Sequence, residues 1–128
     1  MTEAAAEYRE ILEVLQCYID GSSTGDTGKL KEAFHPDARM FGALGGRRYD
    51  VPIGEFMDMA AAMPADTGSY VARVTSVNQV GEVASAVVAE DSCWGAVSFV
   101  DFFSLARIDG VWKIVNKCFA HTGGEMPG

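Results

Sequence analysis

The sequence contains no long hydrophobic run, although apolar residues make up 48% of the chain. Its apolar stretches are short and interrupted, whereas a helix that spans a membrane needs about 20 consecutive apolar residues. The first ten residues, MTEAAAEYRE, are acidic and lack the basic-then-apolar order of a secretory signal peptide. We therefore expect a cytoplasmic protein with no membrane partner.

Basic residues are scarce, because ten Lys and Arg stand against eighteen Asp and Glu and give a formal net charge of −8. Proteins that bind nucleic acid depend on Lys and Arg to neutralise phosphates. This balance excludes a nucleic-acid partner and favours solubility.

Cysteine is also rare, and Cys17, Cys93 and Cys118 form no paired spacing. An odd number of thiols predicts free cysteines in a reducing compartment. Cys118 and His121 resemble half a metal site, but positions i and i+3 of a strand face opposite sides. We therefore expect no metal site. A length of 128 residues predicts a single domain over residues 1–128.

The first half of the chain predicts helices over residues 3–21, 27–34 and 53–63. Gly21 to Gly25 is expected to end the first helix in a loop. His35 is expected to cap the carboxyl end of the second helix, where a cation meets the negative end of the dipole. The first helix has apolar residues three and four positions apart, as one buried face requires: Tyr8, Ile11, Leu12, Leu15, Tyr18 and Ile19.

The remaining segments predict strands. Two short ones, over residues 38–44 and 47–51, precede the third helix, and residues 70–80 and 83–93 follow it. Residues 97–121 then form two long strands around Ile108-Asp109-Gly110, because Asp-Gly between apolar runs is a strong hairpin signal. Early helices and late antiparallel strands predict an α+β fold. Because sheets twist, we expect a curved, cone-shaped antiparallel or mixed sheet wrapped on three helices.

Five segments resemble the nuclear transport factor 2-like, or cystatin-like, superfamily, and most closely its SnoaL-like, lumazine-binding branch. They are Tyr18-Ile19-Asp20-Gly21, Gly25-Asp26, Phe34-His35-Pro36-Asp37-Ala38, Asp101-Phe102-Phe103-Ser104-Leu105 and Asp109-Gly110-Val111-Trp112-Lys113-Ile114. The resemblance covers nearly the whole chain. It implies a pocket between the concave face of the sheet and the helices, and a homodimer formed through the convex face.

The resemblance transfers few functional residues. Tyr18 falls where the ketosteroid isomerases of the superfamily place their hydrogen-bonding tyrosine. Their general-base aspartate corresponds here to Gly42 or a neighbour, so that base is missing. Their second acid falls near Phe103, two residues from Asp101. Steroid isomerisation by their route is therefore not expected.

Asp101 and Lys117 are charged residues within the apolar strands of the last hairpin. If Asp101 faces the interior, the two-residue period places Phe99, Phe103 and Leu105 beside it. Lys117 then shares a face with Val115, Phe119 and His121. The two charges are expected to meet as a cross-strand pair. Such a pair can be an acid/base with its tuning cation, or an ion pair that only fixes register.

Two further polar side chains are candidates. Tyr18 can donate a hydrogen bond to a ligand or to Asp101, or be a core tyrosine. His121 titrates nearest neutral pH and can supply a hydrogen bond, or simply bind backbone at the end of its strand. The predicted catalytic set is Asp101, Tyr18, His121 and Lys117. The predicted ligand wall is Phe41, Phe56, Phe99, Phe103 and Phe119.

These residues suggest a domain that binds a small, largely apolar molecule and performs isomerisation, cyclisation or dehydration by proton transfer. Such steps need no cofactor. The alternative is a non-catalytic ligand-binding or dimerisation module. The alternative predicts a satisfied Asp101–Lys117 pair sealed from any cavity, whereas the enzyme predicts a cavity that touches both Asp101 and Tyr18.

Overall fold

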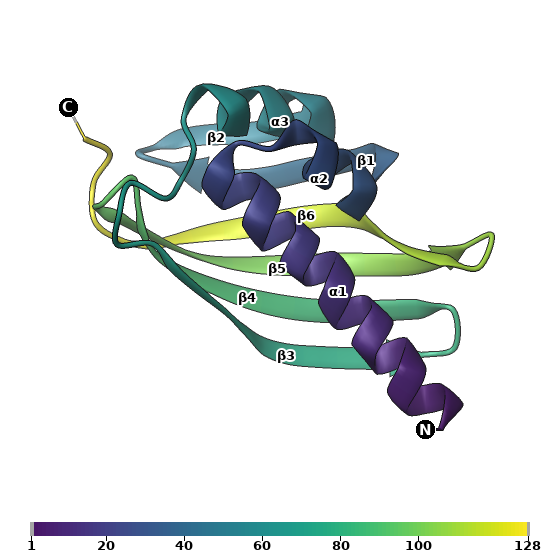
Figure 1. Cartoon of the computed structure of the whole chain (residues 1–128). Helices are drawn as coiled ribbons and strands as arrows, with labels where there is room; N and C mark the ends of the chain where they lie inside the picture. Colours follow the sequence, from purple (N-terminus) through teal and green to yellow (C-terminus); the bar gives the residue numbers. More distant parts are fainter. Residues whose placement is uncertain (1, 128) are drawn as a thin grey trace.

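The computed structural model describes residues 2–127 and has three helices on one face of a six-stranded sheet (Figure 1). The helices are α1 (Glu3–Thr24), α2 (Thr27–Ala33) and α3 (Ile53–Ala62). The strands are β1 (Phe34–Leu44), β2 (Arg47–Pro52), β3 (Val71–Val80), β4 (Val83–Cys93), β5 (Val97–Ile108) and β6 (Val111–Gly123). The predicted α+β order is confirmed.

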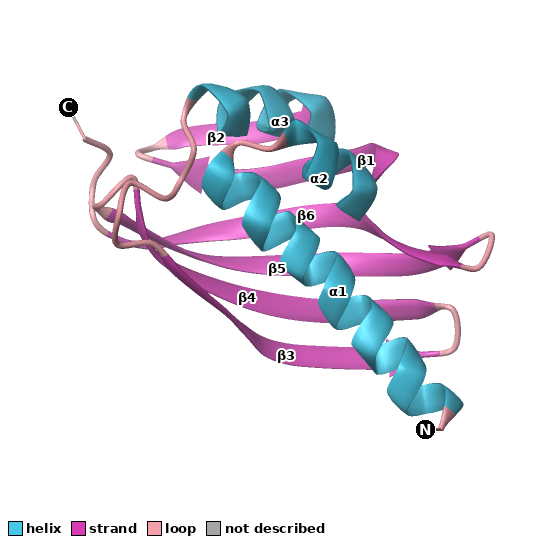
Figure 2. Ribbon diagram, viewed as in Figure 1, coloured by secondary structure: helices cyan, strands magenta, loops and turns pink. Residues whose placement is uncertain are grey.

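The sheet is mixed, curved and unclosed, as Figure 2 shows. Its strand order is β2-β1-β6-β5-β4-β3, and every pair is antiparallel except β1 with β6. We call the face under the helices the covered face and the other the open face. Helix α1 lies across the covered face, while α2 and α3 lie near β1 (Figure 1). No helix in the described range is long and apolar enough to cross a membrane.

The end of α1 differs from the prediction, because the helix continues through Gly21 to Thr24. Gly25 ends it in the left-handed conformation at a φ of 77° and donates its N–H to the Gly21 carbonyl. A Cβ on Gly21 would lie 2.8 Å from Leu30, so this glycine allows α2 to pack closely. The small residues at the end of α1 therefore allow close packing between helices and do not form the predicted loop. Tyr8, by contrast, is half exposed and outside the core.

The predicted role of His35 as a helix cap is wrong. Helix α2 ends at Ala33, and His35 already belongs to β1. Its Nδ1 accepts a hydrogen bond from the Asp37 N–H at 3.0 Å. Phe34 pairs with Ile114 of β6 before an irregularity that ends at Arg39, so the strand begins earlier than expected.

A bulge in β6 changes which side chains face the helices. Ser104 pairs with Asn116, but the next residue of β5, Leu105, pairs with Ile114, so Val115 is the extra residue. Trp112 and Ile114 are buried before the bulge, and Lys117 is buried after it. The expectation that Val115 shares a face with Lys117 is therefore wrong.

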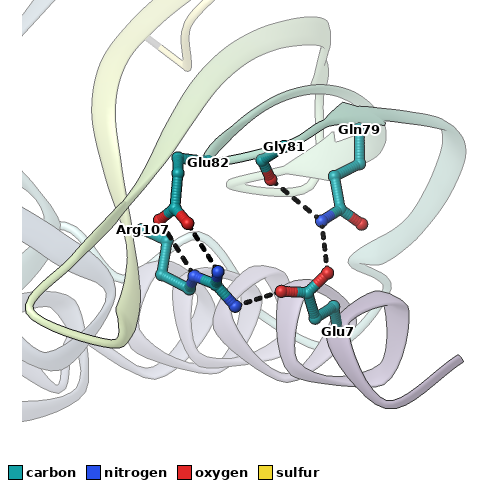
Figure 3. A network of polar contacts seen from close by, with 5 residues as sticks. All are labelled: Glu7, Gln79, Gly81, Glu82 and Arg107. Carbon is teal, nitrogen blue, oxygen red and sulfur yellow. Dashed lines mark hydrogen bonds and ion pairs between the residues drawn. The ribbon is translucent and has the colours of Figure 1, made fainter. Parts of the chain in front are cut away.

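The amino-terminal end of α1 is fixed to the sheet by a charged network (Figure 3). Arg107 of β5 pairs with Glu7 of α1 and with Glu82 of the β3–β4 turn. Gln79 donates to Glu7 at 2.8 Å and to the Gly81 carbonyl at 3.1 Å. Hydrogen bonds from Arg107 lower the pKa of Glu82. This network lies among side chains distinct from those of the cavity described next.

Candidate functional site

A cavity lies between the covered face of the sheet and helices α1 and α3. Its volume is about 60 Å³, and the site is partly open to solvent. Most of its wall is apolar. The lining residues are Tyr18, Ser22, Met40, Leu44, Tyr49, Phe56, Met59, Ala60, Met63, Ala65, Glu90, Cys93, Trp94, Phe99, Asp101, Lys117 and Phe119.

Asp101 lies in β5 with its side chain on the covered face, only 1% exposed. Phe99, Phe103 and Leu105 are buried on the same face, as the strand period predicts. Asp101 Oδ2 accepts a hydrogen bond from the Tyr18 hydroxyl at 2.9 Å. Burial raises the pKa of Tyr18 well above its ordinary value, and the Asp101 charge adds to the rise, so this hydroxyl keeps its proton. Helix α1 thus orients the carboxyl group of Asp101.

The expected ion pair between Asp101 and Lys117 is not present. None of the ion pairs within residues 2–127 includes Lys117. Register explains this, because Asp101 lies opposite Phe119 while Lys117 lies opposite Phe103. The Lys117 Nζ instead lies 3.7 Å from the centre of the Phe56 ring and 4.9 Å from that of Tyr18. Lys117 is therefore a buried cation held against aromatic faces.

A second acid, Glu90 of β4, was missed by the sequence analysis. Glu90 is 4% exposed and lines the cavity with Asp101. Val88 lies opposite Asp101 and Glu90 opposite Phe99, so the two acids are diagonal neighbours on one face. A signal was available, because Ala86, Val88 and Glu90 share the inward period of a strand whose other inward residues are apolar.

The surroundings of Glu90 disfavour its charged form. Its Oε2 accepts only a weak hydrogen bond from the Cys93 thiol, at 3.7 Å, and its Oε1 has no partner within the described chain. Burial raises the pKa of Glu90 well above its ordinary 4.5 and Asp101 raises it further, while Lys117 and Tyr18 lower it by a smaller amount. Burial also raises the pKa of the Tyr70 hydroxyl, which has no partner among residues 2–127.

The structure places only some of the predicted ligand wall at the cavity. Phe56, Phe99 and Phe119 line it. Phe103 packs against Tyr18, with ring centres 4.8 Å apart, and lies in the core rather than at the wall. Phe41 does not line the cavity, in contrast to the prediction. Its neighbour Met40 does, and because successive side chains of a strand alternate, Phe41 points to the open face.

His121 also lies away from the cavity lining. It packs beside Phe99, with ring centres 5.9 Å apart, and its Nε2 lies 3.1 Å from the Gly123 carbonyl oxygen. This arrangement matches the alternative of a terminal histidine bound to backbone. The described residues contain no group of three or more His, Cys, Asp or Glu side chains placed to hold a metal ion.

Gly42 is one of the strand positions that the resemblance matches to the missing aspartate of the isomerases. A Cβ there would lie 2.5 Å from the Phe119 ring, so Gly42 provides room for that ring. An acid at this position would displace Phe119 from the cavity wall. The acids that line the cavity come from β4 and β5.

Known proteins resemble this chain over most of its length. Residues 6–120 match the family described as "Putative lumazine-binding". A curated relative, "Aldolase FrzH" of Cladobotryum sp., is 24% identical over 115 residues, 90% of this chain and 91% of its own.

Solved structures share the fold. A nuclear transport factor 2-like protein of Shewanella baltica superposes with a TM-score of 0.86 at 28% identity, over 97% of this chain and all of its own. One from Methylobacillus flagellatus gives 0.84 at 32% identity, over 92% and 94%. A ketosteroid isomerase-like protein of Erwinia carotovora gives 0.70 at 15% identity, over 88% and 94%, which is a likeness of fold alone. The chain belongs to the "Putative lumazine-binding" family of the nuclear transport factor 2-like superfamily.

Proposed function

We propose that this protein is a cofactor-independent enzyme that moves a proton on a carbon next to a carbonyl group of a small, largely apolar molecule. One observation carries the proposal: a buried carboxyl group, Asp101, faces a cavity with a mostly apolar wall and is oriented by Tyr18. A positioned acid or base of this kind contributes roughly 10²–10⁴-fold to a proton transfer.

In the proposed reaction, the Asp101 carboxylate removes a proton from the carbon and leaves an enol or enolate. Return of that proton to another carbon is an isomerisation, and attack of the enolate on a second carbonyl is an aldol cyclisation. The second outcome agrees with the name of the aldolase relative. Lys117, the cation in the cavity wall, stabilises negative charge that develops on the oxygen.

Deuterium exchange tests the proposal. We would incubate 2-tetralone, a small bicyclic ketone, with the protein in D₂O and follow its hydrogens next to the carbonyl by NMR. We expect the protein to accelerate exchange, and Asp101→Asn to remove roughly 10²-fold or more of that acceleration. Asp58→Asn, a change at an exposed acid of α3, serves as the matched control. Equal rates for the wild type and Asp101→Asn would contradict the proposal.

The alternative is a ligand-binding module without chemistry, and the apolar wall and the family description favour it as the second candidate. Lumazine, which lacks a hydrogen of the required kind, distinguishes the two. Lumazine bound equally by the wild type and Asp101→Asn, with no exchange in 2-tetralone, would support the module.

We also propose a homodimer through the open face of the sheet and a cytoplasmic location. Phe102 is 56% exposed on that face, and its neighbours Val87 and Cys118 on the adjacent strands extend a mostly apolar surface. A second copy of the same surface would cover it by two-fold symmetry. The three cysteines are free thiols, in agreement with a reducing compartment.

A further inference from the structure

We propose that Glu90 and Asp101 share a single proton, held on Glu90, and that Glu90 is the acid that delivers it to the carbonyl oxygen of the substrate. The inference deepens the proposed function, on which its second half rests. It assigns a role to a residue that lies outside the predicted catalytic set, and it defines the substrate as a neutral carbonyl compound.

The two acids lie together at the cavity. Both carboxyl groups are nearly fully buried, both line the cavity, and they come from diagonal positions of neighbouring strands on one face of the sheet. Two carboxyl groups in such a setting repel each other strongly when both are ionised. One proton between the two groups removes this repulsion.

One carboxyl oxygen of Glu90 lacks a hydrogen-bond partner within the described chain. Oε1 is buried and accepts no hydrogen bond within residues 2–127, while its neighbour Asp101 is itself an acceptor. An ionised Glu90 would leave this oxygen unsatisfied, which is costly in a buried site. A proton turns Glu90 into a donor, and Asp101 can accept from it.

The surroundings of the two acids decide which of them holds the proton. Tyr18 donates its hydroxyl hydrogen to Asp101 at 2.9 Å, so Asp101 already acts as the acceptor of a strong hydrogen bond. Glu90 accepts the weaker thiol hydrogen bond of Cys93, and burial and Asp101 outweigh the lowering effect of Tyr18 and Lys117 on its pKa. The proton therefore belongs on Glu90 and the negative charge on Asp101.

The shared proton also sets the charge of the cavity. The pair then carries one negative charge and Lys117 one positive charge, so the site is neutral overall. A neutral ligand enters without leaving a buried charge uncompensated. The titratable and charged groups that face Glu90 are Asp101 from β5, Lys117 from β6, Tyr18 from α1, Tyr70 before β3 and Cys93 of β4.

The proton transfers balance. Asp101 takes a proton as the C–H bond of the substrate breaks, and that electron pair forms the carbon–carbon double bond of the enol. The carbonyl oxygen takes the proton of Glu90, whose O–H bond breaks. The enzyme then holds its proton on Asp101 instead of Glu90, and reversal at either carbon restores the starting state.

An NMR titration of protein labelled with ¹³C in its glutamate carboxyl groups tests the shared proton without any substrate. The Glu90 signal is identified by its loss in Glu90→Gln, and Glu10→Gln identifies an exposed glutamate as the control. We expect Glu90 to remain protonated at pH 7. Asp101→Asn should lower its titration midpoint, and Lys117→Met should raise it. A Glu90 that is ionised at pH 7 in the wild type would overturn the inference.

Exchange in 2-tetralone then tests delivery of the proton. Glu90→Gln should lose roughly 10²-fold of the acceleration, while Glu10→Gln should lose none. An unchanged rate in Glu90→Gln would overturn the role of Glu90 while leaving the proposed function intact. Failure of the proposed function is distinguishable, because the wild type itself would then give no acceleration.

Discussion

At the scale of single residues, the chemistry of this protein depends on where three charged side chains are buried. Asp101, Glu90 and Lys117 are each at most 5% exposed, whereas charged residues are almost never buried this fully unless they are paired. Tyr18 satisfies Asp101, and aromatic rings surround Lys117. Glu90 has the poorest set of partners, so it is the residue whose protonation should respond most to its surroundings.

The raised pKa of Glu90 predicts how stability depends on pH. Above its ordinary value of 4.5, the unfolded chain loses the Glu90 proton while the folded chain keeps it. The folded state then binds more protons, so the free energy of unfolding falls as pH rises, by up to about 1.4 kcal/mol per pH unit. The Glu90→Gln variant has no carboxyl proton at this position, so its free energy of unfolding should not show this decrease with rising pH.

Urea unfolding between pH 4 and pH 8 measures the effect. The stability of Glu90→Gln relative to the wild type should increase steadily with pH across that range, until the folded-state proton is lost. Glu10→Gln should run parallel to the wild type, because that side chain is exposed. Parallel curves for Glu90→Gln and the wild type would show that Glu90 titrates normally in the folded state.

At the scale of helices and strands, turn chemistry made much of the fold predictable. Asp109 and Gly110 both adopt positive φ, at 51° and 80°, as a two-residue hairpin turn requires. The bulge at Val115 has no such signal, because no glycine or proline marks it. The bulge matters because it moves the side chains of Trp112 and Ile114 onto the same face of the sheet as Lys117, whereas an unbroken strand would place them on the opposite face. The end of α1 was unpredictable for a similar reason, because Gly21 looks like a helix breaker until Leu30 packs against it.

At the site, too, the sequence predicted what depends on the local strand period and not what depends on contacts between elements. The strand period correctly placed Asp101 inward, because β5 is regular over residues 99–104. The partner of Asp101 could not be predicted, because it depends on the register between strands and on the position of α1.

The Arg107 network predicts how α1 is held to the sheet. Arg107 pairs with two acids from different elements and its side chain is only 27% exposed, whereas Arg73, paired with Asp91, is 61% exposed. Arg107→Gln should lower the free energy of unfolding by about 1 kcal/mol and Arg73→Gln by less than about 0.5 kcal/mol. Urea unfolding at low and high salt checks this, since salt should narrow the difference. A larger loss for Arg73→Gln would contradict the role given to the network.

At the scale of the whole molecule, the two faces of the sheet have separate roles in this account. The covered face and the helices enclose the cavity, while the open face carries the exposed Phe102 and is the face for which we propose a dimer contact.

Phe102→Asp tests the role of the open face. A charge at the centre of a dimer interface should disrupt it, so sedimentation should report a dimer for the wild type and a monomer for the variant. Val80→Asp, at the more exposed end of edge strand β3, is the control and should leave the dimer intact. A monomeric wild type would contradict the proposed dimer, and the cavity chemistry would be unaffected.

A crystal structure of the protein with 2-naphthol, a planar analogue of the enol of 2-tetralone, would show most directly whether the two carboxyl groups face a bound carbonyl compound. We expect the naphthol ring to occupy the cavity among Phe56, Phe99 and Phe119, with its oxygen within hydrogen-bonding distance of Glu90 or Asp101. A ring bound with its oxygen directed away from both carboxyl groups, or a cavity that excludes 2-naphthol at saturating concentration, would contradict this expectation.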